Sequence, residues 1–324
     1  MSASNVLEVK DLTMHYETSK GPVHAVDNVT FSLARGESMG LVGESGCGKS
    51  SIAISLMKLL PRNAHILHGE ILLNSVDLVP LDEAGIRQYR WRNIAMIFQA
   101  AMNSLNPVHT MESQIMEAIR QHLPQLSAEE MRRRVDGFFE MVGLDPKLKK
   151  QYPHQYSGGM RQRAVIAMAL SCDPDVIIAD EPTTALDVIV QDGLLKEMRA
   201  IQRKLNMAMV YISHDIAVIA EVSDRVGVMY AGCMVELAST NAIFLEPLHP
   251  YTMALMRAFP SILGEKNELT ALPGEPPDLI NPPSGCRFHP RCPFATDICK
   301  SRVPEFEEHA PGHLVACWHP GGKS

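Results

Sequence analysis

The sequence contains no apolar run of the length that a membrane-spanning helix needs. Such a helix takes about 18 or more consecutive apolar residues, whereas the apolar runs here, such as VIIAD and IAMIF, have the length of buried strands. The first residues, MSASNVLEVKDLTMHYE, also lack the basic start and the apolar stretch of a secretory signal. We therefore expect a soluble, intracellular protein.

The sequence also lacks an excess of positive charge. Its 30 Lys and Arg residues against 37 Asp and Glu residues give a formal net charge of −7, so there is no general electrostatic attraction to nucleic acid or to an anionic membrane surface. We predict no nucleic-acid partner, and any membrane association must come through protein partners. Internal repeats and low-complexity tracts are absent as well, and 46% hydrophobic residues suffice for a sizeable core.

An alternation of strand and helix patterns predicts an α/β fold. The segments VLEVKDLTMHY and VDNVTFSLARGESMGLVGE alternate as strands do, and SIAISLMKLL then has apolar residues at helical spacing. VIIAD, MAMVYIS and RVGVMYAG resume the strand pattern around the helix-like VQDGLLKEMRAIQRKL. This order favours a mainly parallel sheet with helices on both faces.

Two regions depart from this alternation. Between about residues 104 and 158, the segments MESQIMEAIRQHL and SAEEMRRRVDGFFEMVGL predict a helical insertion, the second with a capping-box pattern from Ser127 to Glu130. Beyond residue 240, seven prolines between Pro273 and Pro293 favour a rigid appendage built of loops rather than a continued sheet. We therefore expect one domain over residues 1–240, which includes the insertion, and a smaller C-terminal region over residues 241–324.

A glycine-rich segment lies where a strand pattern ends and a helix pattern begins. It satisfies GxxxxGK[ST], in which backbone N–H groups and the helix start together surround phosphate oxygens. Lys49 is expected to bridge the β- and γ-phosphates of ATP, and Ser50 to ligate Mg²⁺. The alternative is a glycine turn that only joins strand to helix. The expected ATP-binding residues of this segment are Gly43, Glu44, Ser45, Gly46, Cys47, Gly48, Lys49, Ser50 and Ser51.

A second nucleotide-site pattern is the apolar run from Val176 to Ala179, which ends in Asp180 and Glu181. A buried strand would present both carboxylates at its tip. We expect Asp180 to support Mg²⁺ through water and Glu181 to accept a proton from the attacking water. An isolated strand end facing solvent is the alternative.

The segment Tyr156-Ser157-Gly158-Gly159-Met160, followed by Arg161-Gln162-Arg163, resembles the signature sequence of ABC ATPases. Ser157 and the two glycines would open a helix and so form a second anion-binding helix terminus. One chain needs only one phosphate cradle. We therefore expect this second cradle to cap the γ-phosphate of ATP held by a partner subunit in a head-to-tail dimer.

Four further positions match this family in order along the chain. Tyr16 is similar to the aromatic residue that stacks on adenine, and Gln99 to the glutamine that senses the γ-phosphate and Mg²⁺. Within Ala185-Leu186-Asp187, the last residue resembles the aspartate that communicates across the dimer. His214 follows a strand pattern as the switch histidine does, which implies contact with the γ-phosphate and orientation of the attacking water.

The resemblance narrows to the ATP-binding subunits of dipeptide and oligopeptide ABC importers through FQAAMNSLNPVHT, YPHQYSGGM, ADEPTTALDV, VMYAG and HPYTMAL. It implies a P-loop, RecA-like nucleotide-binding domain with a helical subdomain and a small Cys-rich C-terminal extension. The sequence departs from the family at Ala100-Ala101, where Asp-Pro is usual, and at Tyr156, where Leu is usual. Neither departure removes a catalytic group.

The family resemblance also implies partners and a place in the cell. These are a second ABC ATPase subunit, identical or related, two transmembrane permease subunits and an extracytoplasmic solute-binding protein, with this chain peripheral at the cytoplasmic face of the membrane. ATP-driven closure of the dimer would move the permease walls and import di- or oligopeptides or similar solutes. The alternative is a soluble ABC ATPase of a non-transport assembly; an exporter ATPase is disfavoured by the absence of a fused membrane domain.

Four of the seven cysteines, with the spacing Cx5Cx6Cx17C, lie near the C-terminal end. A proline-rich region with few apolar residues needs a crosslink to hold it together, and in a reducing compartment thiols indicate metal ligands before disulfides. Spacing alone leaves an iron–sulfur cluster, zinc or free thiols open, whereas the family resemblance implies a 4Fe–4S cluster. We expect His289, His313 and His319 to be bystanders. The predicted ligands are Cys286, Cys292, Cys299 and Cys317.

Overall fold

The computed structural model describes residues 5–99, 105–184, 186–258 and 274–322. The chain divides into two compact units. The first unit comprises Met1–Leu7, Leu33–Ser38 and Leu72–Tyr211, and the second comprises Glu8–Ser32, Met39–Ile71 and Ile212–Ser324. Among the described residues, no helix combines the length and apolar character needed to cross a membrane.

In the first unit, buried strands lie beside a group of helices. Strand β6 (Ile94–Ile97) pairs in parallel with β7 (Val176–Asp180), and β8 (Ala208–Ile212) is the other neighbour of β7. Every residue of β7 and β8 is buried, as expected for strands covered on both faces. The short α2 (Glu83–Arg87) and the two-residue strand β5 (Val76–Asp77) precede them.

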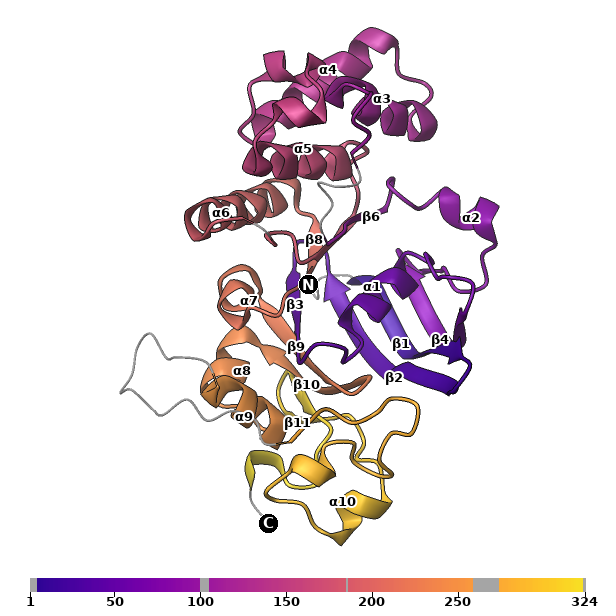
Figure 1. Ribbon diagram of the computed structural model, residues 1–324, viewed down its shortest axis with the longest axis vertical. Helices are drawn as coiled ribbons and strands as arrows, with labels where there is room; N and C mark the ends of the chain where they lie inside the picture. The colour runs from indigo at the N-terminus through magenta and orange to yellow at the C-terminus, as the bar shows by residue number, and fades with distance from the viewer. Residues whose placement is uncertain (1–4, 100–104, 185, 259–273, 323–324) are drawn as a thin grey trace. The chain divides into compact units, whose positions relative to one another are not determined.

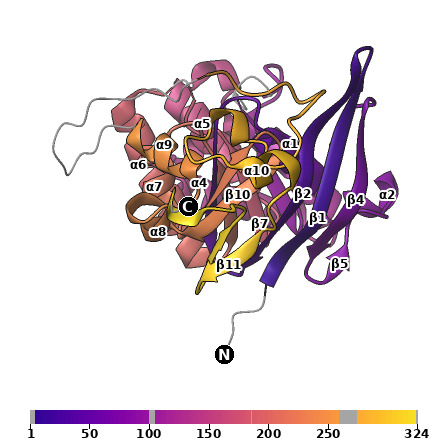
Figure 2. The ribbon, with the colours of Figure 1, turned by 90° about the horizontal axis from the view of Figure 1, so that it is seen from below.

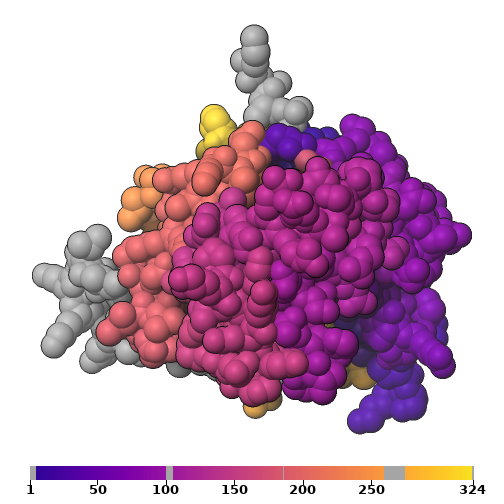
Figure 3. Space-filling view, turned by 90° about the horizontal axis from the view of Figure 1, so that it is seen from above, coloured from indigo at the N-terminus to yellow at the C-terminus, as the bar shows by residue number. Residues whose placement is uncertain are grey.

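The predicted helical insertion is present in the first unit, where its helices pack together (Figure 1). Its helices are α3 (Met111–His122), α4 (Ala128–Met141) and α5 (Gly158–Leu170), and α6 (Val188–Leu205) follows β7. The capping box at Ser127 is confirmed, because its hydroxyl accepts the Glu130 N–H while the Glu130 carboxylate accepts the Ser127 N–H. Figure 3 shows the outer surface of this helical segment in magenta and pink.

The second unit contains most of three strands of a four-stranded sheet, and it also contains strands of a mixed sheet. In the four-stranded sheet, β1 (Asn5–Thr18) lies between β2 (Gly21–Ala34) and β4 (Ala64–Leu73), in the order β2-β1-β4-β5 (Figure 2). In the mixed sheet, β3 (Ser38–Val42) pairs in parallel with β9 (Arg225–Tyr230), and β10 (Cys233–Ser239) pairs antiparallel with β9. Helices α1 (Lys49–Leu56), α7 (Ile216–Val222), α8 (Thr240–Leu245) and α9 (Pro250–Arg257) complete this part.

The C-terminal segment corrects one prediction, because it continues the sheet. Strand β12 (His313–Val315) pairs antiparallel with β10, and β11 (Glu307–Ala310) pairs with β12. The fully buried carboxylate of Glu236 in β10 meets the His313 imidazole at 2.7 Å. With four and three residues, these strands are too short for periodicity to reveal them. The proline-rich part from residue 274 to 305 is built of loops, with only η4 (His289–Arg291) and α10 (Asp297–Ser301).

Candidate functional site

The glycine-rich loop joins the end of β3 at Val42 to the start of α1 at Lys49, as predicted. Gly43 and Gly48 have φ angles of 149° and 107°, which L side chains rarely adopt. A Cβ atom would also lie 2.2 Å from the Met229 carbonyl oxygen at Gly43, and 2.1 Å from that of Ala25 at Gly48. These two glycines are therefore required by backbone packing within the second unit.

Lys49 lies folded over the loop. Its Nζ donates to the carbonyl oxygens of Gly43 at 2.7 Å and Glu44 at 3.0 Å, and it lies 3.5 Å from the Cys47 Sγ. The residue is only 8% exposed. Burial raises the pKa of the Cys47 thiol, so the thiol is neutral and Lys49 has no anionic partner in it. A phosphate placed in this loop could therefore take over Lys49 donors that now serve backbone carbonyls.

The remaining loop and helix-start residues are open to solvent or close to Tyr16. Ser45, Gly46 and Ser50 are exposed, which leaves the Ser50 hydroxyl accessible to an ion. The Tyr16 hydroxyl, from β1, lies 3.2 Å from the Ser51 Oγ. The structure therefore brings the predicted adenine-stacking residue to the predicted phosphate-binding helix.

In the first unit, the carboxylates at the end of β7 are held in different ways. Asp180 is 5% exposed. Glu181 has a φ of 48°, a left-handed conformation that is uncommon for a residue with a side chain. Its Oε2 accepts hydrogen bonds from the Gln99 Nε2 and from the Thr184 Oγ1, both at 2.9 Å. The structure thus brings Gln99 and Glu181 together, as a base and its neighbouring amide would need.

Thr184 was not identified from the sequence as a site residue. It lies within ADEPTTALDV, but a hydroxyl three positions after a glutamate is common in turns and gives little signal. Its neighbour Ala185 lies outside the described residues, as do Ala100 and Ala101. The other named departure, Tyr156, is 3% exposed and donates its hydroxyl to the Leu148 carbonyl at 2.6 Å. The buried Tyr156 hydroxyl is therefore satisfied by a hydrogen bond, which the Leu that is usual at this position would not require.

The signature segment forms a helix start, as predicted. Ser157 is the N-cap of α5 and accepts the Met160 N–H at 3.3 Å, so Gly158 and Gly159 form its first turn. Asp187 caps α6 in the same way and accepts the Val190 N–H at 2.9 Å. In the second unit, His214 follows β8 and is exposed.

The four C-terminal cysteines line one pocket of the second unit, together with aromatic side chains such as Phe288, Phe294 and Trp318. None of the four is in a disulfide. The backbone N–H of His319 donates to the Cys317 Sγ at 3.3 Å.

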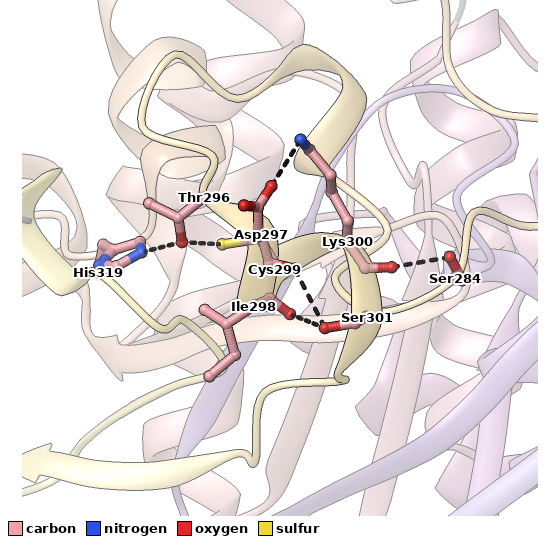
Figure 4. Close-up of polar contacts among 8 residues, drawn as sticks. All are labelled: Ser284, Thr296, Asp297, Ile298, Cys299, Lys300, Ser301 and His319. Carbon is pink, nitrogen blue, oxygen red and sulfur yellow. Dashed lines mark hydrogen bonds and ion pairs between the residues drawn. The ribbon is translucent and has the colours of Figure 1, made fainter.

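Burial raises the pKa of the Cys286, Cys292 and Cys317 thiols and so favours their protonated form. It raises the pKa of Cys286 to about 11 and that of Cys317 to about 12. The hydroxyl of Thr296 lies 3.6 Å from the Cys299 Sγ and 2.7 Å from the His319 Nε2 (Figure 4).

The predicted 4Fe–4S cluster is not supported by direct metal-site geometry. Among the described residues, no group of three or more His, Cys, Asp or Glu side chains is arranged to hold a metal ion. The four cysteines nevertheless line the same pocket. His289 and His319 also line the pocket, whereas His313 pairs with Glu236.

Comparison with known proteins adds two family matches. The family model described as ABC transporter matches residues 26–184, and the model described as the C-terminal region of oligopeptide/dipeptide transporters matches residues 235–299. Among solved structures, the ATP-binding cassette MJ0796, a dimer in a post-hydrolysis state bound to ADP and Pi, superposes with a TM-score of 0.65 at 26% identity. The alignment covers 72% of this chain and 98% of the cassette.

Curated relatives match almost the whole chain. It is 46% identical to the dipeptide transport ATP-binding protein DppD of Bacillus subtilis, with 97% of this chain and 94% of the relative covered. It is 43% identical to the oligopeptide transport ATP-binding protein OppD of Escherichia coli, with 98% and 94% covered. A probable peptide ABC transporter ATP-binding protein of Sinorhizobium fredii is 44% identical, with 98% and 95% covered.

Proposed function

Because this chain belongs to the family of ATP-binding proteins of dipeptide and oligopeptide ABC transporters, we propose that it binds and hydrolyses ATP to drive the import of short peptides. The observation that carries this proposal is the phosphate loop between β3 and α1, in a chain that matches peptide-transport ATPases over nearly its full length. The alternative, a soluble ABC ATPase of a non-transport assembly, is not favoured by these relatives.

The ATP site would be divided among residues of stated roles. Lys49 binds the β- and γ-phosphates, Ser50 and Gln99 ligate Mg²⁺, and Asp180 supports the ion through water. Tyr16 stacks on adenine. The magnesium ion, when bound, neutralises charge that develops on the transferred phosphoryl group.

Hydrolysis would use Glu181 as the general base, with its carboxylate oriented by Gln99 and Thr184. Two hydrogen bonds to one oxygen hold that carboxylate in a single orientation, which is the preorganisation that a base needs. His214 would contact the γ-phosphate and orient the water. Asp187 would communicate with the second subunit.

We further propose a head-to-tail dimer in which Ser157, Gly158 and Gly159 cap the γ-phosphate on the partner subunit. The solved structure of the MJ0796 cassette is a dimer. Beside Asp187, the side chains of Val188 and Ile189 are 80% and 85% exposed, which favours coverage by another protein surface. Two permease subunits and an extracytoplasmic solute-binding protein complete the importer, with this chain peripheral at the cytoplasmic face of the membrane.

The proposed domain limits are 1–240 for the ABC ATPase domain, with the helical subdomain near 104–158, and 241–324 for the Cys-rich C-terminal extension. The match of the oligopeptide/dipeptide C-terminal model to residues 235–299 supports the second limit.

We also propose that Cys286, Cys292, Cys299 and Cys317 hold a 4Fe–4S cluster. The support is the pocket that all four cysteines line, in which the His319 N–H donates to the Cys317 sulfur, because four cysteine thiolates are the ligand set that such a cluster takes. When bound, the cluster would crosslink the C-terminal loops. Iron and sulfide assays with absorption spectra of anaerobically purified protein test this, and a colourless, zinc-loaded sample would contradict it.

The transport proposal is tested by reconstitution. The intact complex is purified in detergent, its subunits are identified, and it is placed in proteoliposomes with its binding protein and labelled di- and oligopeptides. We expect peptide uptake that requires Mg²⁺ and ATP on the side of this chain. A purified complex that hydrolyses ATP but contains no permease subunits, or that takes up no peptide, would contradict the proposal.

A further inference from the structure

An ion pair in the second unit connects the cysteine pocket to the phosphate loop. Arg291 belongs to η4, which lies between Cys286 and Cys292. Its Nη1 and Nη2 donate to the two carboxylate oxygens of Glu44 at 2.8 and 3.0 Å. The Arg291 side chain is only 6% exposed and that of Glu44 23%. A bidentate pair whose arginine side chain is almost fully enclosed fixes both the distance and the orientation of its partners.

Aromatic side chains form a second connection between the same two places. The Glu44 N–H donates to the Tyr251 hydroxyl at 2.9 Å, and Arg291 also donates to the Tyr230 hydroxyl at 3.3 Å. The Tyr230 and Tyr251 rings lie 4.6 Å apart, and Phe288 packs against both at 5.1 and 5.5 Å. Because Phe288 also lines the cysteine pocket, a displacement in the pocket would reach the phosphate loop.

We propose that Arg291 is a positioning residue for ATP binding, which holds the phosphate loop through Glu44 and links its geometry to that of the cysteine pocket. The backbone of Glu44 is held on both sides, because its N–H donates to the Tyr251 hydroxyl and its carbonyl accepts from Lys49 and from the Cys47 N–H. The pair with Arg291 adds a contact through the side chain. This inference rests on the proposed binding of ATP by that loop.

The first test measures the ATP dissociation constant, KM and kcat of the full-length chain. We expect Arg291→Gln to raise the dissociation constant and KM about tenfold, because a misplaced loop loses phosphate contacts, and to change kcat by less than about threefold. Arg291→Lys keeps the charge but not the bidentate geometry, so it should lie in between. Wild-type affinity in a folded Arg291→Gln protein would overturn the proposal.

A double-mutant cycle then asks whether the effect passes through Glu44. If it does, Glu44→Gln and the double variant Glu44→Gln/Arg291→Gln should each weaken ATP binding by the same factor of about ten. A hundredfold loss in the double variant would show independent effects and overturn the assignment.

Arg287 offers a matched control. It is a buried arginine of the same loop, but its ion-pair partner is Asp27, outside the phosphate loop, and it also donates to the Ala231 carbonyl. We expect Arg287→Gln to lower the melting temperature and to change the ATP dissociation constant by less than about twofold. A loss of affinity equal to that of Arg291→Gln would attribute the effect to general loosening and overturn the specific role of Arg291.

The link to the cysteine pocket is tested with Cys292→Ser, alone and with Arg291→Gln. We expect Cys292→Ser to weaken ATP binding several-fold in the presence of Arg291 and to add less than about twofold in its absence. Where this variant does not fold, alkylation of chelator-treated protein with iodoacetamide replaces it in both backgrounds. Equal effects in the two backgrounds, or no effect on affinity, would overturn the link. Wild-type protein that does not bind ATP would contradict the proposed function instead.

Discussion

The phosphate loop and the cysteine pocket are both loop-built sites of the second unit, but they are held in different ways. In the phosphate loop, glycines allow close backbone contacts with Ala25 and Met229, so the shape comes from the main chain. In the cysteine pocket, sulfurs and aromatic rings from distant segments surround a space, so the shape comes from side chains. The shape of a site made by the main chain can be recognised from a short sequence motif. The shape of a site made by side chains depends on the fold that brings them together and on what occupies the site.

The largest effect is expected where only the nucleotide chemistry is touched. Glu181→Gln removes the proposed general base but keeps a side chain that can be held by Thr184, so we expect kcat to fall by about 10² to 10⁴-fold while ATP binding is kept and the closed dimer accumulates. Steady-state hydrolysis and size-exclusion chromatography with Mg²⁺ and ATP measure this. Normal turnover would exclude Glu181 as the base.

The second prediction tests whether backbone packing shapes the phosphate loop. Gly48→Ala places a Cβ against the Ala25 carbonyl at 2.1 Å with φ at 107°, so we expect a loss of about 2 to 4 kcal/mol in the free energy of unfolding and little ATP binding. Chemical denaturation and nucleotide titration measure both. Gly46→Ala is the control, since φ is 80° but a Cβ meets nothing within 4 Å. An equal loss of stability in the two variants would contradict the role of backbone packing.

The third prediction concerns the cysteine pocket and uses the same kind of glycine substitution. At Gly285, φ is 67° and a Cβ would lie 2.4 Å from the Cys299 carbonyl oxygen, so Gly285→Ala should cost about 1 to 3 kcal/mol in the free energy of unfolding and lower the iron content expected from the proposed cluster. Its control is Gly312→Ala, with φ at 70° and open space around the Cβ. Iron content and thermal unfolding are the measurements. If both variants retained iron at the wild-type level, the turn at Gly285 would not contribute to the shape of the cysteine pocket.

The mildest change is expected for Thr184, whose role was not predicted from the sequence. Thr184→Val removes one of two hydrogen bonds to the Glu181 carboxylate at nearly constant volume. A hydrogen bond to a charged group contributes about 1.5 to 3 kcal/mol, and because Gln99 still holds the carboxylate we expect kcat to fall only about three- to tenfold, with KM for ATP unchanged. A proportional rise of KM would assign Thr184 to nucleotide binding instead.

Much of the nucleotide site could be predicted because its parts are local. Ser157 and Asp187 cap the helices that their sequences predict, and the phosphate loop lies between the predicted strand and helix. Thr184 and Arg291 could not be predicted. Thr184 is one of many hydroxyl residues found in turns. Arg291 contacts Glu44, which lies far away in the sequence, and no local sequence pattern indicates such a contact. The added strands β11 and β12 were missed because strands of four and three residues are too short to show an alternating pattern.

The α/β class, the phosphate loop, the helical insertion and the family can all be recognised in the amino-acid sequence, because each depends on residues that are neighbours in the chain. The long-range partners of these elements are seen only in the folded chain: the thiols of one pocket, the Arg291–Glu44 pair and the strands that extend the sheet beyond β10. Hydrogen bonds and ion pairs act only at contact distance, and only folding brings residues 44 and 291 within it.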